Sequence, residues 1–480
     1  MMGLSGSAAH SESLLEALSS AYLYNPTLKA ARAQLRATDE EVPRAISGFR
    51  PTVSGQVLQT YQHIETNPSA PGIEGDTDPR EYSVTLNQPL FRGFRTINAV
   101  KGAEALVEAG REDLRSSEQQ VLFNSITAYV DVVRDTAVLE LRQNNLRVLS
   151  EQLRAAQDRF EVGEVTKTDV AQARARTSGA TSDISAARAN LQASRATYAQ
   201  LIGNAPRTLR DPGPSRVTPR SMEEALQIGE GENPTILSTL FRERAQDHAI
   251  KQVKGELLPS ADLQVNYTML NGETGVGVKR EDITTVTGVL TVPIYQAGEV
   301  SARIRQNIET RSQLRHQIDE AREAVRANII SAWGVLVSAR AQIISDQAQV
   351  DANQIALAGV KEEEKVGQRT VLDVLNAEQE LLNSQVNLVT SRRDLAVASY
   401  ALLASIGRLS INTLSLPVEQ YDPTKHYRNV KWKWIGWSTS VEESEAGPAV
   451  APVTATGRTP GQPSGDGPAY TGSFRDFFAQ

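Results

Sequence analysis

Residues 160–170 read FEVGEVTKTDV, and residues 364–374 read EKVGQRTVLDV. Both stretches contain Val-Gly and Asp-Val at the same spacing, and they lie 204 residues apart (373 − 169 = 204). Further motifs recur in the same order: Asn25-Pro26, Gln88-Pro89 and Ile202-Gly203 in the first half, then Asn233-Pro234, Val292-Pro293 and Ile406-Gly407 in the second. A repeat this long indicates a duplicated unit of about 200 residues rather than a short solenoid motif. One chain therefore contains two similar structural halves.

The composition favours thin, elongated packing over one thick core. Of 480 residues, only 40% are apolar and 5% aromatic, which suits helices rich in Ala, Ser, Gln and Leu. The formal net charge is −7, and 50 basic residues are interspersed with 57 acidic ones. Because no basic stripe follows from this pattern, we expect no nucleic-acid partner.

The residue inventory offers little chemistry to an enzyme. The chain has no cysteine and only five histidines, so we expect no thiolate chemistry, metal site or cofactor. No nucleophile elbow, phosphate-binding glycine loop or His-Glu-x-x-His motif occurs, and no catalytic residue is predicted. No run of 18 or more apolar residues occurs, so we expect no transmembrane helix. The first eleven residues lack the apolar core of a secretory signal, so we expect either a cytosolic protein or one whose signal has been removed.

Heptad spacing predicts a helix around each Asp-Val motif. In the first half, core positions recur every seven residues from Val170 to Tyr198, and small residues, mostly alanine, follow three positions after most of them. The same frame runs from Val374 to Leu402 in the second half. A strict seven-residue repeat produces a left-handed supercoil, and small residues let neighbouring helices approach closely. Coiled-coil helices are therefore expected over 167–202 and 370–406.

A longer helix is predicted to precede each of these. Leu139, Leu146 and Leu153 keep the seven-residue step, and no proline occurs between Arg95 and Val162. At 1.5 Å per residue, such a segment is about 100 Å long. Glycine is common just past the end of a helix, and Gly163 and Gly367 occupy that place. Each half is thus expected to form an antiparallel hairpin, 92–162 with 167–202 and 295–366 with 370–406.

Four further segments have strand-like composition, with apolar and polar residues alternating most clearly in the second and third: 52–64, 81–90, 260–270 and 282–293. In the third, Leu263 and Val265 face one side while Gln264 and Asn266 face the other. Each strand has about the ten residues that a tilted strand needs to cross a bilayer. The chain is therefore expected to supply a membrane sheet with two unlike faces.

Such a sheet cannot lie in lipid alone, because the N–H and C=O groups at its edges would remain unsatisfied. Three chains with four strands each would close a 12-stranded barrel, an even number within the bacterial range. The same trimer would surround the hairpins with copies of themselves. The predicted fold class is a mixed membrane β-barrel and long α-helical coiled-coil barrel, built by a duplicated protomer as a homotrimer.

These ordered motifs resemble those of the TolC-like outer-membrane factors, the trimeric exit ducts of Gram-negative type I secretion and multidrug efflux systems. The resemblance runs from Ser11 to Leu414. It rests on Asn-Pro-Thr at Asn25 and Asn233, on QPLF over 88–91 with VPIY over 292–295, and on the two Val-Gly turns. Residues 421–437, rich in Tyr, Trp and Lys, look like the C-terminal extension of alphaproteobacterial members linked to protein secretion.

The resemblance implies a location and partners. It places the protein in the cell outer membrane, with a helical portion extending into the periplasm. The implied partners are two further copies of the chain, outer-membrane lipid, a periplasmic adaptor (membrane fusion) protein, and an inner-membrane ABC or RND transporter. The alternative is a soluble or periplasmic coiled-coil scaffold without a channel. The strands of bilayer length argue against this scaffold, and the missing signal segment argues for it.

The resemblance also implies a gate at the periplasmic mouth. Asp373 matches a carboxylate that forms a ring around the three-fold axis, where like charges select cations. Asn376, one turn later, replaces a second expected aspartate, and Asp169 is the equivalent of Asp373 in the first half. Arg369 matches an arginine that ties neighbouring hairpins together, whereas Glu364 stands where better-known members have a tyrosine. Helix capping is the alternative role for both aspartates, and an exposed turn position is the alternative for Arg369.

Two further sets of residues follow from the resemblance. The hairpin tips, which would meet the adaptor, comprise Val162, Gly163, Glu164, Val366, Gly367 and Gln368. Phe91, Phe94 and Tyr295 are expected at the membrane interface, where the barrel becomes helix, in preference to a place in the core.

The chain is expected to divide into five parts. These are a first repeat over 12–206, a linker over 207–220, a second repeat over 221–409, an equatorial extension over 410–439 and a tail over 440–480. The tail is rich in Gly, Pro, Ser and Thr, so we expect it to be disordered.

Overall fold

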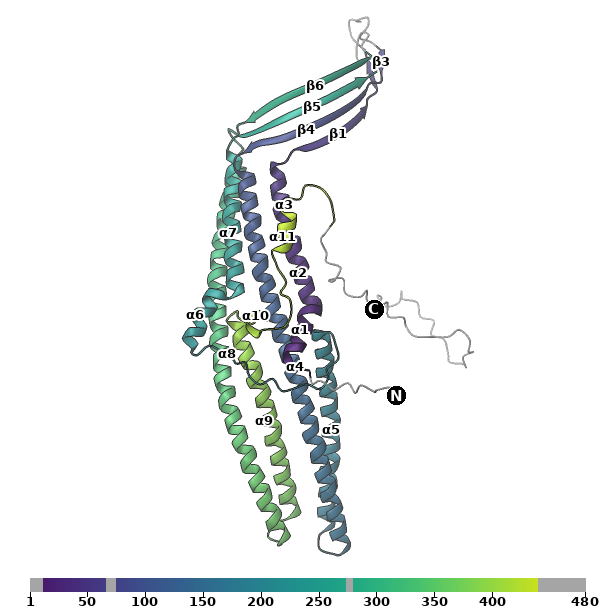
Figure 1. Ribbon diagram of the computed structural model, residues 1–480, viewed down its shortest axis with the longest axis vertical. Helices are drawn as coiled ribbons and strands as arrows, with labels where there is room; N and C mark the ends of the chain where they lie inside the picture. The colour runs from purple at the N-terminus through teal and green to yellow at the C-terminus, as the bar shows by residue number, and fades with distance from the viewer. Residues whose placement is uncertain (1–11, 66–74, 273–278, 439–480) are drawn as a thin grey trace, which may run out of the picture. The chain divides into compact units, whose positions relative to one another are not determined.

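A computed structural model of the chain describes residues 12–65, 75–272 and 279–438. The predicted disordered tail over 440–480 lies outside the described residues, as does the last residue of the predicted extension. The chain up to Trp437 forms one compact unit. Within this unit, a four-stranded sheet lies at one end of a set of long helices (Figure 1).

Two antiparallel helical hairpins form the helical part of the unit. The first pairs α4 (Arg95–Glu161) with α5 (Lys167–Ile202), and the second pairs α8 (Glu299–Lys365) with α9 (Val371–Ser405). Both long helices contain 67 residues, and their tips lie at the same end of the molecule (Figure 1). The heptad residues of α5 and α9 are buried or half-buried, as expected for a coiled-coil seam.

The long helices begin three or four residues later than the predicted starts at 92 and 295. Gly93 and Phe94 precede α4, and Ala297 and Gly298 precede α8, all four with positive φ. This left-handed backbone cannot continue into a right-handed helix, so it delays each helix start. Gly93 is also required by space, because a Cβ atom there would lie 2.2 Å from the carbonyl oxygen of Gly255.

The sheet contains β1 (Thr52–Gln59), β4 (Arg80–Arg92), β5 (Ser260–Asn271) and β6 (Arg280–Thr291), all antiparallel in the order β1-β4-β5-β6. The single strand predicted over 52–64 is wrong. After the pair Gln59–Arg80 the ladder stops, since Pro79 has no N–H to donate. The chain then forms a separate two-stranded ribbon of β2 (Gln62–Ile64) and β3 (Gly75–Thr77).

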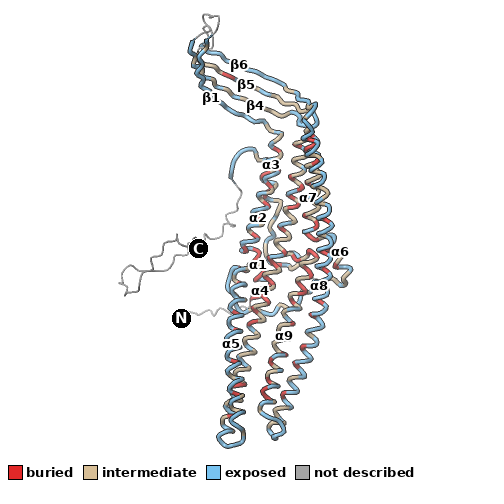
Figure 2. The backbone as a smooth tube through the Cα atoms, turned by 180° about the vertical axis from the view of Figure 1, so that it is seen from behind, coloured by how far each residue is buried: buried red, intermediate tan, exposed pale blue. Residues whose placement is uncertain are grey.

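The register aligns one apolar and one polar face across all four strands. Val53 pairs with Leu86, Leu86 with Val265, and Val265 with Val286, forming an apolar row. The next row contains Ser54, Thr85, Asn266 and Thr285, and within it the Thr85 hydroxyl donates to Asn266 Oδ1 at 2.9 Å. Figure 2 shows that these strands are mostly exposed or half-buried, whereas most of the buried residues lie on the helices. The two-faced sheet expected from the sequence is therefore present.

Shorter helices lie beside the long ones, from their middle to the end nearer the sheet: α1 (Leu14–Tyr24), α2 (Pro26–Asp39), α3 (Glu41–Ile46), α6 (Met222–Glu232), α7 (Pro234–Lys254), α10 (Ile411–Leu414) and α11 (Lys425–Val430). Two 3₁₀ turns, η1 (Ser47–Phe49) and η2 (Gly255–Leu257), lead into β1 and β5. The main hydrophobic core lies at this level, and Tyr129 and Tyr198 are among its fully buried side chains.

The two Asn-Pro-Thr motifs join the short helices to the ends of the return helices. Asn25 caps α2 by accepting from the N–H of Thr27, and its side-chain amide donates to the carbonyl of Leu201 at 2.8 Å. Asn233 caps α7 in the same way and donates to the carbonyl of Ser405 at 2.9 Å. The repeated motif is thus a repeated junction.

One helix, α8, contains an 18-residue window with a mean hydropathy of 1.3, long and apolar enough to cross a membrane. Polar residues are interspersed in this window, so the sequence contains no uninterrupted apolar run there. Only 11% of the window is buried within this chain. Its exposed members include Ile330, Val337 and Ile344, which recur at every seventh position.

Candidate functional site at the hairpin tips

Each hairpin tip is a tight, glycine-dependent turn. Gly163 and Gly367 adopt φ values of 81° and 77°. The amide of Glu164 donates to the carbonyl of Arg159 at 2.9 Å, and the amide of Gln368 donates to that of Glu363 at 2.9 Å. These bonds from beyond the helix end close the last turn of each long helix.

The residues expected to meet an adaptor are all exposed at these turns. Val162 and Val366 expose 72% and 71% of their surface, and the flanking Gly163, Glu164, Gly367 and Gln368 are exposed as well. Two nearly identical apolar side chains therefore project into solvent from two nearly identical turns.

Asp169 and Asp373 both cap the helix that follows the turn. Asp373 accepts from the amide and hydroxyl of Thr370 at 2.9 and 2.8 Å, and its own amide donates back to the Thr370 hydroxyl. Asp169 makes the same contacts with Thr166. The hydrogen bonds from Thr370 and Thr166 lower the pKa of both carboxyl groups, so each stays charged at neutral pH. The capping role is present in both repeats, and the capping carboxylate of each tip is charged.

Arg369 pairs within its own hairpin. Its Nε donates to Glu363 Oε2 at 2.9 Å, and the two side chains are about half exposed. A bond from Arg369 to a neighbouring chain therefore remains a proposal.

Glu364 links the two hairpins of one chain. Its Oε1 lies 2.5 Å from Nη1 of Arg159, so an ion pair connects the end of α8 to the end of α4. The Glu364 side chain is only 17% exposed, which reduces screening by solvent. No motif in the sequence marks Arg159 for this role. One signal was present, because Arg159 and its repeat equivalent Glu363 carry opposite charges (363 − 159 = 204).

A second polar contact and an apolar cluster join the hairpins nearby. Nη2 of Arg176 on α5 donates to Oδ1 of Asn376 on α9 at 2.9 Å. Leu375, which is 1% exposed, packs into a cluster formed by Leu149, Ala156, Ala173 and Ala180 of the first hairpin. The small alanines admit the leucine closely, so the two hairpins are held side by side near their tips.

The predicted interface aromatics lie where the sheet passes into helix. The rings of Phe91 and Phe94 meet edge to face, with centroids 5.2 Å apart and an interplanar angle of 89°. Phe91, Phe94 and Tyr295 expose 38%, 53% and 85% of their surface, so none belongs to the core. Exposed aromatic rings of this kind are expected where an apolar surface or medium outside the chain contacts them.

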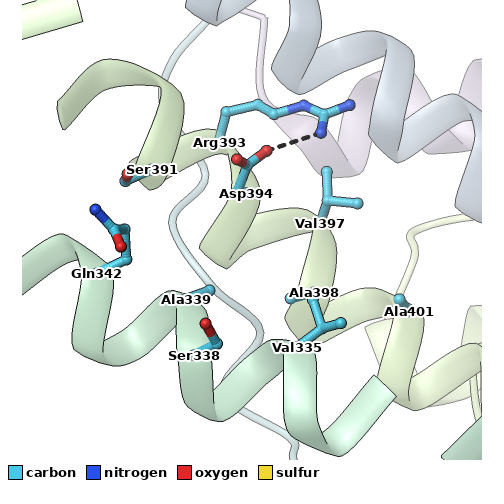
Figure 3. A pocket seen from close by; sticks show the side chains of 10 residues that line it. All are labelled: Val335, Ser338, Ala339, Gln342, Ser391, Arg393, Asp394, Val397, Ala398 and Ala401. Atoms are coloured by element: carbon cyan, nitrogen blue, oxygen red, sulfur yellow. Dashed lines mark hydrogen bonds and ion pairs between the residues drawn. The ribbon is translucent and has the colours of Figure 1, made fainter. Parts of the chain in front are cut away.

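A cavity of about 370 Å³ lies between α8 and α9 (Figure 3). Small and polar side chains line it, among them Ser338, Ala339, Ser391 and Ala398. Arg393 at its edge pairs with Asp394 and with Asp131 of α4, both within 3 Å. Arg393 therefore joins α9 to the first hairpin rather than offering a free charge to a ligand.

Among residues 12–65, 75–272 and 279–438, no group of three or more His, Asp or Glu side chains is placed to hold a metal ion. At the tips, Arg159 pairs with Glu364, Arg369 pairs with Glu363, and Asp169 and Asp373 cap helices. This arrangement of ion pairs and caps can hold the ends of the hairpins together and can also let them separate.

Comparison with known proteins gives concordant matches. The family model described as "Outer membrane efflux protein" matches residues 17–204 and 225–408, one match for each repeat. The chain is 40% identical over 437 residues to the outer membrane efflux protein BepC of Brucella suis biovar 1 (strain 1330), covering 91% of this chain and 94% of that protein. It is 25% identical to the outer membrane protein TolC of Escherichia coli (strain K12), covering 87% and 88%.

The fold is also matched by a solved structure. The outer membrane channel CmeC of Campylobacter jejuni superposes with a TM-score of 0.73 at 17% identity, covering 87% of this chain and 89% of that chain.

Proposed function

Because this chain belongs to the outer membrane efflux protein family, we propose that it forms the outer-membrane exit duct of an efflux or type I secretion system. The observation that carries this proposal is the four-stranded sheet with one apolar face and two open edges, joined to hairpins about 100 Å long. The sheet suits the outer membrane and the hairpins suit the periplasm. In a soluble scaffold, this apolar face would be exposed to water, which is unfavourable.

The duct requires three copies of the chain. β1 and β6 are the edges of the sheet, and pairing β1 of one copy with β6 of the next satisfies both edges. The helical part supports the same assembly. Ile330, Val337 and Ile344 form an uncovered heptad stripe on α8, the pattern expected where a neighbouring helix packs.

The exposed tips are the surface for a periplasmic adaptor that recruits an inner-membrane ABC or RND transporter. Val162 and Val366 supply apolar contacts there, and the glycine turns leave room for an approaching helical hairpin. Since both tips share one geometry, both are suitable docking points.

The contacts near the tips form a closed gate. The Arg159–Glu364 and Arg176–Asn376 pairs hold the second hairpin against the first, and opening would separate them. In the trimer, Asp373 contributes a ring of three carboxylates at the mouth and selects cations. Arg369 adds a bond to the adjacent chain when it exchanges Glu363 for a partner there.

The proposal is tested with the purified full-length protein. We expect a detergent-dependent trimer by native mass spectrometry and stepwise, cation-selective conductance when the protein is added to a planar lipid bilayer. A monodisperse monomer without detergent, together with no conductance, would support the scaffold instead.

A further inference from the structure

The chain after α9 runs back along the short helices toward the sheet. The amide of Tyr421 donates to the hydroxyl of Tyr22 at 3.1 Å, and the guanidinium of Arg32 stacks between the two rings. Figure 1 shows α11 beside α2 and α3, and the chain after α11 turns outward at the level of α3. This path continues past the last residue matched by the family model, Arg408.

Ion pairs and burial fix the position of α11 and the residues after it. The hydroxyl of Tyr427 and Nζ of Lys431 both donate to Glu104 Oε1 of α4, at 3.1 and 3.0 Å. Val430 is 5% exposed, and Nε2 of His426 lies 3.3 Å from Glu40 Oε1. The segment that follows is therefore attached at a defined height on the molecule.

Arg50 fixes the far end of this segment beside the membrane sheet. Its Nη1 donates to the carbonyl of Lys433 at 2.8 Å, and its guanidinium lies 4.7 Å from the ring centroid of Trp434. Arg50 is two residues before the start of β1 at Thr52. The segment thus lies at the level where the helical part of the chain passes into the sheet.

The end of the segment is apolar and exposed. Trp432, Trp434 and Trp437 expose 68%, 65% and 99% of their surface, and Ile435 exposes 90%. Three of the four tryptophans of the chain therefore lie within six residues, on a segment whose backbone is attached. Arg50 and Lys431 cover only part of the Trp434 and Trp432 rings, and so large an exposed apolar surface is unfavourable in water.

We propose that Trp432–Trp437 inserts into the headgroup region of the phospholipid leaflet that faces the periplasm. Tryptophan suits this region because its ring is apolar while its N–H still needs a polar partner. Val53 and Val57 of β1, exposed by 66% and 67%, continue the apolar surface upward into the predicted hydrocarbon region. The segment is a lateral anchor that each copy adds outside the barrel, and this role rests on the proposed outer-membrane function.

Continuity with β1 and the amphipathic chemistry of tryptophan favour lipid over a second copy of the chain as the occupant. A second copy would cover the rings with protein, and that arrangement gives a different spectroscopic result. The segment can be observed selectively, because replacing Trp333 by phenylalanine leaves tryptophan only at Trp432, Trp434 and Trp437.

The test uses the full-length W333F trimer in phosphatidylethanolamine and phosphatidylcholine vesicles, with and without bromine on the acyl chains near the headgroups. We expect blue-shifted emission and a loss of emission in the brominated vesicles. Red-shifted emission that aqueous acrylamide quenches would show that the segment lies in water and would overturn the proposal. Blue-shifted emission without loss in brominated vesicles would show cover by protein and would overturn it too.

Three further variants separate the anchor from the channel. Val84→Trp, in a chain whose four tryptophans are replaced by phenylalanine, reports on the apolar face of β4. If the Val84→Trp probe is quenched while the segment in the W333F protein is not, the anchor is refuted and the barrel is supported. If neither is quenched, the membrane placement itself is refuted. Arg50→Gln should reduce the quenching of the segment, while Arg44→Gln, which breaks only an exposed pair with Glu41, should not.

Discussion

The ion pair of Glu364 with Arg159 holds the end of α8 to the end of α4. Glu364→Gln should weaken the ion pair with Arg159 by about 0.5–1 kcal/mol in each of three chains, since Arg159 is 41% exposed. The three losses act on one gate, so the open population and the bilayer conductance should rise. Glu151→Gln, which breaks the exposed Arg147–Glu151 pair within α4, is the matched control. Equal conductance in both variants would remove Glu364 from the gate.

Comparing variants of Asp373 and Asp169 distinguishes the helix-capping role of these residues from the effect of charge at the mouth. Both make the same cap, so Asp373→Asn and Asp169→Asn should lower the melting temperature by similar amounts. Only Asp373→Asn should weaken cation selectivity, because only the second hairpin is expected to line the mouth. Reversal potentials in a salt gradient measure this selectivity, and equal reversal potentials in the two variants would leave Asp373 a cap alone.

Part of the tip could be predicted from sequence, and part could not. Glycine turns and Asp-Val starts depend on local backbone chemistry, so Gly163, Gly367, Asp169 and Asp373 were found from short motifs. The Arg159–Glu364 pair joins residues 205 positions apart, and its formation depends on how two hairpins pack. A single sequence gives no direct signal for such a contact, apart from the charge reversal between the repeats.

At the level of elements, the strands offer the sharpest contrast. Val265 belongs to the apolar row of β5, and Gln264 belongs to the polar face. Val265→Arg should destabilise the barrel by about 2–4 kcal/mol if that row faces lipid near the middle of the bilayer, whereas Gln264→Arg should cost much less. Unfolding of the reconstituted trimer in guanidinium measures both. Similar losses in the two variants would contradict the assignment of the faces.

The junction of α2 with α4 should respond to pH. Asp39 is fully buried, neither carboxyl oxygen accepts a hydrogen bond, and burial raises its pKa to about 7 despite the nearby Arg111. A raised pKa means that stability is full below the ordinary pKa of an aspartate and is lost as the pH rises through about 7. Between pH 6 and 8 the loss should be on the order of 1 kcal/mol.

Thermal unfolding at pH 6 and pH 8 tests this dependence. Asp39→Asn should remove only the share of the difference that Asp39 contributes, because the amide cannot ionise while burial also raises the pKa of Glu118 to about 7. Glu41→Gln, at a residue about half exposed on α3, should leave the difference unchanged. An unchanged difference in Asp39→Asn would assign the whole pH dependence to other groups, Glu118 among them.

Helices and strands could be predicted correctly where a single periodicity was enough to identify them. The heptads predicted α5 and α9, and alternation predicted β5. The strand over 52–64 was drawn too long because alternation continues past Gln59 while the pairing partner ends at Pro79. The starts of α4 and α8 shifted because Phe94 and Ala297 adopt positive φ, which their residue types do not signal.

The assembly should depend on the uncovered stripe of α8. Ile344, 72% exposed in one chain, lies in that stripe, so Ile344→Lys should place a charge in each predicted contact between copies. We expect a smaller trimer fraction by native mass spectrometry. Ser345→Lys, one position away on the same helix and also exposed, is the control and should assemble normally. A normal trimer in both variants would place the contact elsewhere.

The equal lengths of α4 and α8 limit how this molecule can change in size. Both helices have 67 residues, and the contact of Glu364 with Arg159 requires their ends to stay level. An extra heptad in α4 alone would shift its end by about 10 Å past that of α8, beyond the reach of the ion pair. Insertions and deletions are therefore tolerated only as matched pairs, one in each repeat and each with a compensating change in its return helix. A duct adapted to a wider or narrower periplasm therefore needs the same change of length in both repeats.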